Sequence, residues 1–465
     1  MRILPILLIA VFTCGCMVGP NYKRPAVAVP AAYRGAETAT SMPASPTGAS
    51  SFGDLKWQEV FHDPVLQNLI STALRQNFDL RTAAARILEA EGELAVARSQ
   101  EFPQVNGTAG AARQKTAPNR ILPSFTTSDL QLGGSASWLL DFWGEYRRAT
   151  EAARANLLAT EYGEQAVRVT LVSEVATAYF QLRALDLQLQ ISESTLKSRQ
   201  ASLKLTQIRQ QGGVASLLDV RQAESLVETA ETTITDIRRL IAQQEDFISI
   251  LLGENPASIP RGKPLNQETL APTIPPGLPS ALLERRPDIR EAEQELVAAN
   301  ARIGVARAEF FPQIALTASG GTESFELSRL FTGPSGVWTF AGSLMQPIFT
   351  GGRLRGNLQA ARAQEQEVLF TYQKTVQEAF REVSDALISY QRSREFLTEQ
   401  QALTQTLADA DRLARTRYQG GVTSYLEVLQ QEIQYFTAQL DLAQARLSEL
   451  TSVVQLYQAL GGGWQ

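Results

Sequence analysis

Two long helical patterns dominate the chain. From Glu145 to Gln210 there is no proline, and apolar residues recur at steps of three, four or seven. This stripe comprises Val167, Leu171, Val175, Leu182, Leu185 and Leu189. A second proline-free stretch runs from Arg353 to Gln419. The spacing predicts helices of about 66 residues, or roughly 100 Å at 1.5 Å per residue. Such lengths are typical of a coiled coil or a helical tube rather than of a compact core.

Shorter segments alternate between apolar and polar residues, which predicts β-strands. One strand face would carry Leu130, Leu132, Ala136 and Trp138, and the other Asp129, Gln131, Ser135 and Ser137. The segments QIALTAS, from Gln313, and VWTFAGSLMQ, from Val337, alternate in the same way. The pattern predicts four strands of about ten residues, the length of a tilted strand that crosses a bilayer.

The starts of two further helices can be read from their capping residues. Asp63 stands directly before Pro64, which predicts an N-cap followed by the first helical residue. Asp288 and Glu291 have the spacing of a capping box, which predicts a second helix start there.

The chain repeats itself at an offset of 208 or 209 residues. RQQGGVASLLDVRQAE, from Arg209, matches RYQGGVTSYLEVLQQE, from Arg417, at ten of sixteen positions. Other segments recur in the same order, and a proline-rich stretch separates the halves as a linker. We therefore expect a first repeat at 61–252, a linker at 253–279 and a second repeat at 280–465. Each repeat would supply one helix, one strand pair and one long helical hairpin.

The first residues predict export and lipidation. After Met1 and Arg2, eleven mostly apolar residues form a core too short to span a bilayer, as in a signal peptide. The core ends in TCGC, which is typical of a bacterial lipoprotein processing site with Cys16 as the lipidated residue. We expect a signal peptide at 1–15 and a lipidated tether at 16–60. Met17 is not an aspartate, which favours sorting to the outer membrane over the inner one.

Composition argues against several classes of function. The net charge is −5 without a basic block, which disfavours nucleic acid as a partner. Both cysteines lie at the processing site, and the single histidine, His62, has no cysteine or second histidine to bind a metal with it, so we expect no metal and no cofactor. The glycine pairs lack the Gly-Lys-Ser/Thr pattern of a phosphate loop. With no catalytic constellation, we expect no enzyme.

The predicted strands need an oligomer if they are to cross a membrane. The sequence has no run of eighteen apolar residues for a transmembrane helix, and strands cross only as a closed barrel because an open edge leaves unpaired backbone groups in lipid. Four strands are too few to close one. Three copies would supply twelve strands around a lumen, and on this count alone a dimer stays open.

A series of motifs runs along nearly the whole mature chain. They are VGPNYKRPAVAVPAAY, WQEVFHDPVLQNLI, LLERRPDIREAE, FFPQI, QPIFTGGRLRGNL and the ending LYQALGGGW. Together they resemble outer membrane efflux proteins of the TolC superfamily, in particular the OprM/NodT-type lipoproteins of RND efflux systems. The resemblance implies an α+β membrane channel, a trimer with a twelve-stranded outer-membrane β-barrel (four strands per chain) continued by a long α-helical periplasmic barrel.

The same resemblance implies a function and partners. The chain would be the exit duct of a tripartite efflux pump that exports small molecules such as drugs across the outer membrane. Its partners would be a periplasmic adaptor and an inner-membrane RND-type transporter. Two alternatives stay open: a type I secretion-type duct for proteins, and a periplasmic adaptor or scaffold lipoprotein. An adaptor should carry one hairpin between β-rich halves, not a duplication with four bilayer-length strands.

The two double-glycine turns are predicted to form the tips of the long hairpins. Glycine after a helix end accepts left-handed backbone geometry, which lets the chain reverse. In the family such tips meet the adaptor, which implies docking by Gly212, Gly213, Val214, Ala215, Gly420, Gly421, Val422 and Thr423.

Carboxylates follow each tip and suggest a gate. Threefold symmetry would bring inward-facing members of the set Asp219, Glu224, Glu427 and Glu432 into acidic rings, which favour cations. The alternative for each is a solvated charge on the outer face. The resemblance adds Tyr418, where relatives carry an aperture tyrosine, and Gln430, where relatives carry charge.

Overall fold

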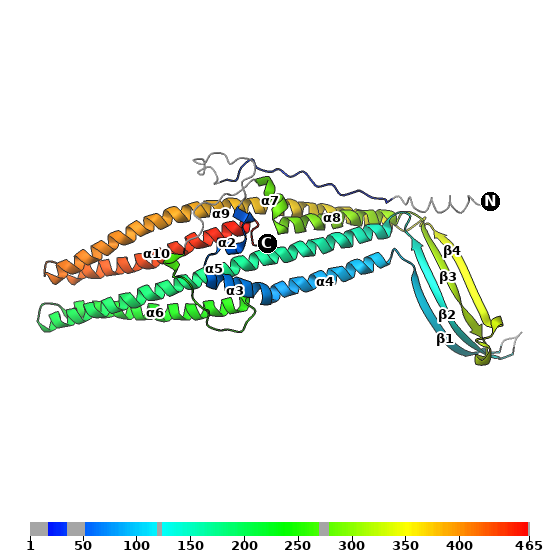
Figure 1. The fold of residues 1–465 in the computed structure, drawn as a ribbon, viewed down its shortest axis with the longest axis horizontal. Helices are drawn as coiled ribbons and strands as arrows, with labels where there is room; N and C mark the ends of the chain where they lie inside the picture. Colours follow the sequence, from blue (N-terminus) through cyan, green and yellow to red (C-terminus); the bar gives the residue numbers. More distant parts are fainter. Residues whose placement is uncertain (1–16, 35–51, 119–122, 269–278, 464–465) are drawn as a thin grey trace. The chain divides into compact units, whose positions relative to one another are not determined.

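The computed structural model describes residues 17–34, 52–118, 123–268 and 279–463 (Figure 1). Cys16, the predicted lipidation site, lies outside the described residues. The helices are α2 (Trp57–Val60), α3 (Pro64–Gln76), α4 (Phe78–Ser99), α5 (Glu145–Gln211), α6 (Leu217–Leu251), α7 (Pro279–Arg285), α8 (Pro287–Ala308), α9 (Arg353–Gln419) and α10 (Tyr425–Ala459). The strands are β1 (Gln104–Lys115), β2 (Thr126–Leu140), β3 (Gln313–Ser324) and β4 (Gly336–Met345). The described residues also form the short 3-10 helices η2 (Phe52–Asp54), η3 (Leu265–Gln267), η4 (Leu327–Arg329) and η5 (Gly333–Ser335).

The lengths of the helices reproduce the internal repeat. α5 and α9 have 67 residues each, α6 and α10 have 35 each, and α4 and α8 have 22 each. The two long helices begin at the expected residues and end at or one residue beyond the expected ends, which confirms the prediction from the proline-free stretches.

The chain forms two compact units that do not coincide with the repeats. One unit holds the N-terminal residues up to 26 together with 86–161 and 291–373, and the other holds 27–85, 162–290 and 374–465. Each unit therefore combines corresponding pieces of both halves of the sequence. α5 and α9 run from one unit into the other.

The first unit contains one antiparallel sheet in the order β1-β2-β3-β4. Its register aligns Leu316 with both Trp138 and Gly342, and Ala318 with both Ala136 and Phe340. Because side chains alternate along a strand, the apolar residues of neighbouring strands lie on one face and Ser137 and Thr317 lie on the other. Within the described residues, β1 and β4 each pair with a single strand and form the two edges of the sheet.

Small residues bring α5 and α8 together in this unit. Ala152 and Ala155 of α5 are buried against Ala298 and Ala301 of α8. Side chains this small allow two helix backbones to approach closely, and the packing fixes the helices that carry the strands.

The described parts of the predicted tether, residues 17–34 and 52–60, make specific contacts with the rest of the chain. The backbone N–H of Val18 donates to Trp143 O at 3.0 Å, and Arg148 Nη2 donates to Asn21 Oδ1 at 2.7 Å. In the second unit, Trp57 and Val60 of α2 are buried. The described parts of this region pack against the helices because their apolar and polar groups find specific partners there.

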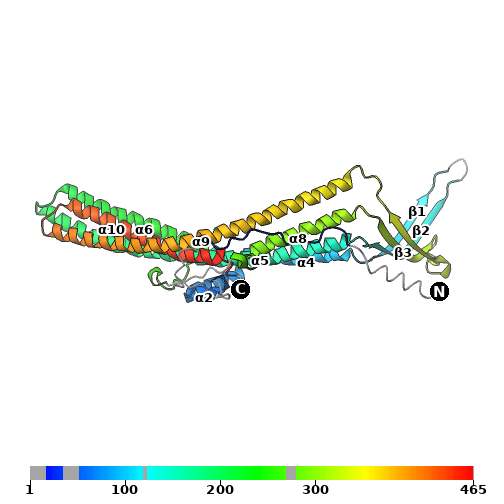
Figure 2. The same cartoon turned by 90° about the horizontal axis from the view of Figure 1, so that it is seen from above.

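The second unit has an aromatic core next to the long hairpins. Phe61 packs edge-on against Tyr457 with ring centroids 6.1 Å apart, and Phe180 and Phe52 complete the cluster. The hydroxyl of Tyr457 donates to Leu55 O at 2.7 Å, which ties α10 to the residues before α2. Beyond this core, α5 runs alongside α6 and α9 alongside α10 (Figures 1 and 2).

Both predicted helices are present, but only the first begins at its predicted capping residue. Asp63 caps α3 by accepting from Val65 N, with Pro64 as the first helical residue. α8, however, already begins at Pro287, so Asp288 lies inside its first turn. The Asp288 carboxylate instead binds the Arg286 guanidinium, with Nη2–Oδ2 at 2.6 Å, because a buried guanidinium requires a charged partner.

Candidate functional site

Each long hairpin turns at the predicted double glycine. Gly213 has φ +73° and Gly421 has φ +74°, the left-handed geometry that glycine accepts without strain. Val214 N donates to Arg209 O at 2.9 Å, and Val422 N donates to Arg417 O at 3.0 Å. These bonds form the Schellman arrangement, which satisfies the last carbonyls of α5 and α9.

The predicted docking residues are mostly exposed at these turns. Val214 is 71% exposed and Val422 is 73% exposed, although valine is an apolar residue. Gly212, Gly213, Gly420 and Gly421 are also exposed, and Ala215 and Thr423 are half-buried. Both tips therefore present a small apolar surface with little side-chain bulk.

The two predicted carboxylates of the first hairpin form their contacts within α6 and its N-cap residue. The Asp219 carboxylate accepts from Ser216 N at 2.8 Å, and Ser216 Oγ accepts from Asp219 N, which forms a capping box at the start of α6. Glu224 accepts from Arg221 Nη1 at 2.5 Å, one turn away on the same helix. Both contacts are local to α6.

Glu427, the repeat equivalent of Asp219, makes a longer-range contact. Its carboxylate accepts from Arg417 Nη1 at 3.0 Å and from the Thr423 hydroxyl. The ion pair spans the second turn, from the end of α9 to the start of α10. Gln430, three residues further along α10, is exposed.

Glu432 is the most deeply buried of the predicted gate residues, with a side chain that is 2% exposed. Its Oε1 accepts from Arg415 Nη2 of α9 at 3.0 Å and from the Ser202 hydroxyl of α5 at 3.1 Å. Its Oε2 accepts no hydrogen bond from the described part of the chain. Burial raises the pKa of Glu432, against the opposing effects of Arg415 and of the bond from Ser202.

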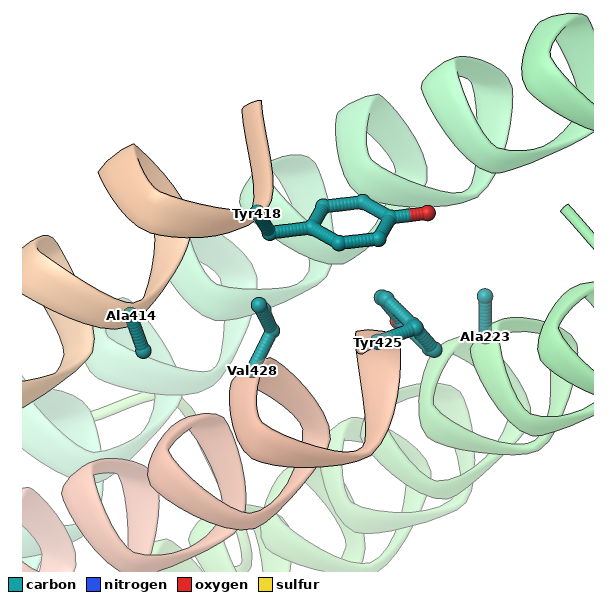
Figure 3. Packing of buried hydrophobic residues seen from close by; sticks show 5 residues of the cluster. All are labelled: Ala223, Ala414, Tyr418, Tyr425 and Val428. Carbon is teal, nitrogen blue, oxygen red and sulfur yellow. The ribbon is translucent and has the colours of Figure 1, made fainter. Parts of the chain in front are cut away.

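Tyr418 lies in an apolar cluster just behind the second turn. Its ring packs on Tyr425 with centroids 5.5 Å apart, and Ala223, Ala414 and Val428 complete the cluster (Figure 3). Ala223 belongs to α6, so the cluster joins the two hairpins.

Arg209 of the first hairpin also reaches Tyr418. Its guanidinium lies 4.4 Å from the centroid of the tyrosine ring, and its Nη1 donates to Tyr418 O at 2.9 Å. The two hairpins therefore meet here both through apolar packing and through the Arg209 guanidinium.

Sequence reasoning missed the basic half of this site. Arg415 donates to Asp411 and to Glu432, and the buried Arg199 stacks on Phe436 with its guanidinium 4.8 Å from the ring centroid. These residues and neighbouring hydroxyls line a polar cleft of about 520 Å³ between α5, α9 and α10. Only Arg209 carried a usable signal, because it aligns with Arg417 in the repeat.

No cluster of three or more histidine, cysteine, aspartate or glutamate residues that could bind a metal occurs in the part of the chain that the structure describes. Among these same residues, no helix is long and apolar enough to cross a membrane.

The comparisons with known proteins all indicate the same family. The family model "Outer membrane efflux protein" matches twice, at residues 69–254 and 278–462, once in each half of the duplicated sequence.

Relatives of known function match over almost the whole length. The toluene efflux pump outer membrane protein TtgC of Pseudomonas putida is 39% identical over 97% of this chain and 93% of its own. The cation efflux system protein CusC of Escherichia coli is 37% identical over 98% of both chains.

Among solved structures, the open state of the Neisseria gonorrhoeae MtrE outer membrane channel superposes with a TM-score of 0.87. It shares 32% identity, over 97% of this chain and 99% of its own. The duplicated helix, strand-pair and hairpin architecture is thus that of an outer-membrane channel, and the chain belongs to the outer membrane efflux protein family.

Proposed function

We propose that this outer membrane efflux protein works as a homotrimer in which three four-stranded sheets close one twelve-stranded barrel. The observation that supports this is the sheet with two open edges and one apolar face. β1 and β4 each leave one row of backbone groups without a strand partner among the described residues, and an edge like this is not tolerated in lipid. Pairing of β4 with β1 of the next copy satisfies both edges.

The two faces of the sheet fit lipid on one side and water on the other. Trp138, Leu316 and Phe340 lie on the face that would contact lipid. Ser137, Thr317 and Thr339 lie on the opposite face, which would line the lumen. This alternation is typical of strands in outer-membrane barrels.

The long hairpins would extend into the periplasm as an α-helical barrel that ends at the glycine tips. The exposed Val214 and Val422 offer apolar anchors, which suits docking to the helical hairpins of a periplasmic adaptor. An inner-membrane RND-type transporter would complete the tripartite pump.

The cargo would consist of small molecules. The relatives are named for toluene and cation efflux, which differ widely in chemistry although the chains are alike over nearly their full length. This diversity is expected of a duct whose cargo is chosen by the transporter. A lumen without a dedicated binding site passes both.

The gate would lie just behind the second tip. Of the predicted residues, Tyr418, Glu427 and Glu432 make contacts that tie one helix to another, and these contacts would hold the resting channel narrow. Asp219 and Glu224 act within α6 and would shape the first tip. Gln430, on α10, would be a lumen-facing polar group.

The chain would be anchored through an acylated Cys16. Met17 packs against Gly144. The backbone N–H of Val18 donates to the carbonyl oxygen of Trp143, three residues after the end of β2. An acyl chain on Cys16 would therefore enter the membrane beside the helical end of the sheet.

Reconstitution of the purified protein into planar bilayers, together with mass measurement in detergent, tests the assignment. We expect a mass of three chains and discrete conductance steps. A monomer that never conducts would overturn the proposal, and a conducting dimer would overturn the twelve-stranded barrel.

A further inference from the structure

Two buried carboxyls lie where the linker between the repeats packs on the second unit. Asp63 precedes α3, and Glu268 ends the described part of the linker, 253–268. Both residues are at most 2% exposed. Neither belongs to the hairpin tips or to the gate, so the pair needs a separate explanation.

Asp63 is held as an acceptor from three directions. Its Oδ1 accepts from Val65 N at 2.9 Å, and its Oδ2 accepts from the Tyr179 hydroxyl at 2.6 Å and from Lys263 N at 3.3 Å. Gly262 passes so close that a Cβ there would clash with the Asp63 carboxylate. The linker is therefore shaped to bring its backbone against this carboxylate.

Glu268 forms a side-chain hydrogen bond with Asp63, and its Oε1 has no partner in the described part of the chain. Two carboxyls in hydrogen-bond contact need a proton between them, because two buried like charges repel. Asp63 already accepts hydrogen bonds from Val65 N, the Tyr179 hydroxyl and Lys263 N, so it is the acceptor of the pair. The shared proton is accordingly carried by Glu268.

The two arginines near Glu268, Arg446 and Arg183, donate to groups other than its carboxyl. Arg446 of α10 donates to the backbone oxygen of Glu268 at 2.7 Å, not to its carboxyl. Arg183 of α5 donates to Lys263 O at 3.1 Å and to Asp186 at 2.6 Å. The charged and titratable groups around Glu268 are thus Asp63, Tyr179, Arg183, Lys263 and Arg446.

We propose that Asp63 and Glu268 form a proton-dependent latch that fixes residues 253–268 of the linker against α3 and α5. The latch is closed while the pair shares a proton, and it loosens when both carboxyls are ionised. It depends on contacts within one chain, so it stands or falls independently of the proposed duct.

Neutral pH is the working range of this latch. Burial first, and then Asp63 through its charge and its hydrogen bond, raise the pKa of Glu268 to about 7, while Lys263 and Arg183 act in the opposite direction. Since the pKa is raised in the docked state, the contribution of Glu268 to docking is complete in acid and is lost as the pH rises through about 7.

Hydrogen exchange of the full-length protein tests the latch. Protection factors for amides in 254–268, corrected for the intrinsic pH dependence of exchange, are compared between pH 5 and pH 8. We expect the wild type to lose protection by up to about tenfold per pH unit as Glu268 ionises. Glu268→Gln keeps a donor for Asp63 and should stay protected at every pH, and Glu268→Ala should be weakly protected at every pH.

Glu254→Gln is the matched control, because Glu254 lies in the same linker but is exposed. The protection factors of this variant should change with pH as those of the wild type do. Equal protection of the wild type at pH 5 and pH 8 would overturn the proposal. A loss of protection in Glu268→Gln that parallels the wild type would overturn it as well, and this variant is close enough in shape to fold.

Discussion

Arg209 of the first hairpin lies over the ring of Tyr418 in the second, 4.4 Å from its centroid, and donates to the tyrosine carbonyl at 2.9 Å. The repeat equivalent, Arg417, does something else and pairs with Glu427 across its own turn. Equivalent arginines in the two copies thus make different contacts. One joins the hairpins, and the other closes a single hairpin.

Removing Arg209 should loosen the resting channel. The stacking and the hydrogen bond together are worth about 1–2 kcal/mol, so Arg209→Ala should raise the open probability roughly tenfold. The open probability of Arg209→Lys should lie between those of the wild type and Arg209→Ala, because lysine keeps the charge but loses the planar stacking. Single-channel recording measures this. Arg239→Ala, in an exposed ion pair with Asp236 on α6, is the control and should leave the open probability unchanged.

Glu427→Ala should widen or leak the resting pore and weaken cation preference. The pair with Arg417 is partly exposed and worth up to about 1 kcal/mol, so we expect a severalfold change in open probability. Conductance and reversal potential in a salt gradient give both quantities. Glu395→Gln, in an exposed pair on α9, should behave as the wild type. Unchanged conductance and ion preference in Glu427→Ala would remove Glu427 from the gate.

Removing one member of the buried Arg415–Glu432 pair should destabilise the protein more than removing both. Arg415→Met leaves Glu432 buried without its cation, a loss of roughly 3–5 kcal/mol for a fully buried pair. The loss should be smaller here because the Arg415 side chain is 29% exposed. The double variant Arg415→Met with Glu432→Leu should recover part of the melting temperature, as followed by circular dichroism. A double variant that melts below Arg415→Met would contradict this.

The same pair makes the stability of the second hairpin sensitive to pH. Burial raises the pKa of Glu432, so its contribution is present in acid and is lost as the pH rises through the shifted value. Arg415→Met removes a cation that lowers the pKa and should raise it further. Carboxyl titration by infrared spectroscopy on isotope-edited protein tests the direction, with Glu432→Gln lacking the signal.

The four tip glycines should split into two classes. Gly213→Ala and Gly421→Ala place a side chain at positive φ, which costs about 1–2 kcal/mol and should raise local opening at least roughly fivefold. Gly212→Ala and Gly420→Ala are the matched controls, because their φ is not positive and a Cβ would meet only ordinary contacts, the nearest at 3.5–3.6 Å. Hydrogen exchange at the tips distinguishes the classes, and equal effects at all four positions would contradict the turn geometry.

Cys16→Ser should abolish acylation without destroying the fold. The packing of Met17 and Val18 on the first unit does not require the acyl chain. Metabolic labelling with a palmitate analogue should mark the wild type only. A label that persists in Cys16→Ser would place the modification elsewhere.

The sequence by itself determined the elements and their order. Proline-free stripes and double glycines predicted α5, α9 and both turns to within a residue, because helix propensity and left-handed glycine geometry are local properties. Alternation predicted the sheet faces for the same reason. The family motifs extended this to the whole chain.

Tertiary structure alone decided which charges meet. Asp219 and Glu427 are equivalent in the sequence, yet the shorter side chain caps its own helix and the longer one reaches Arg417. The pairs of Arg415 with Glu432 and of Asp63 with Glu268 join residues from different helices or from segments about 200 residues apart. Such partners depend on how helices pack and exclude water, and a sequence pattern with a period of two or 3.6 residues carries no information about them.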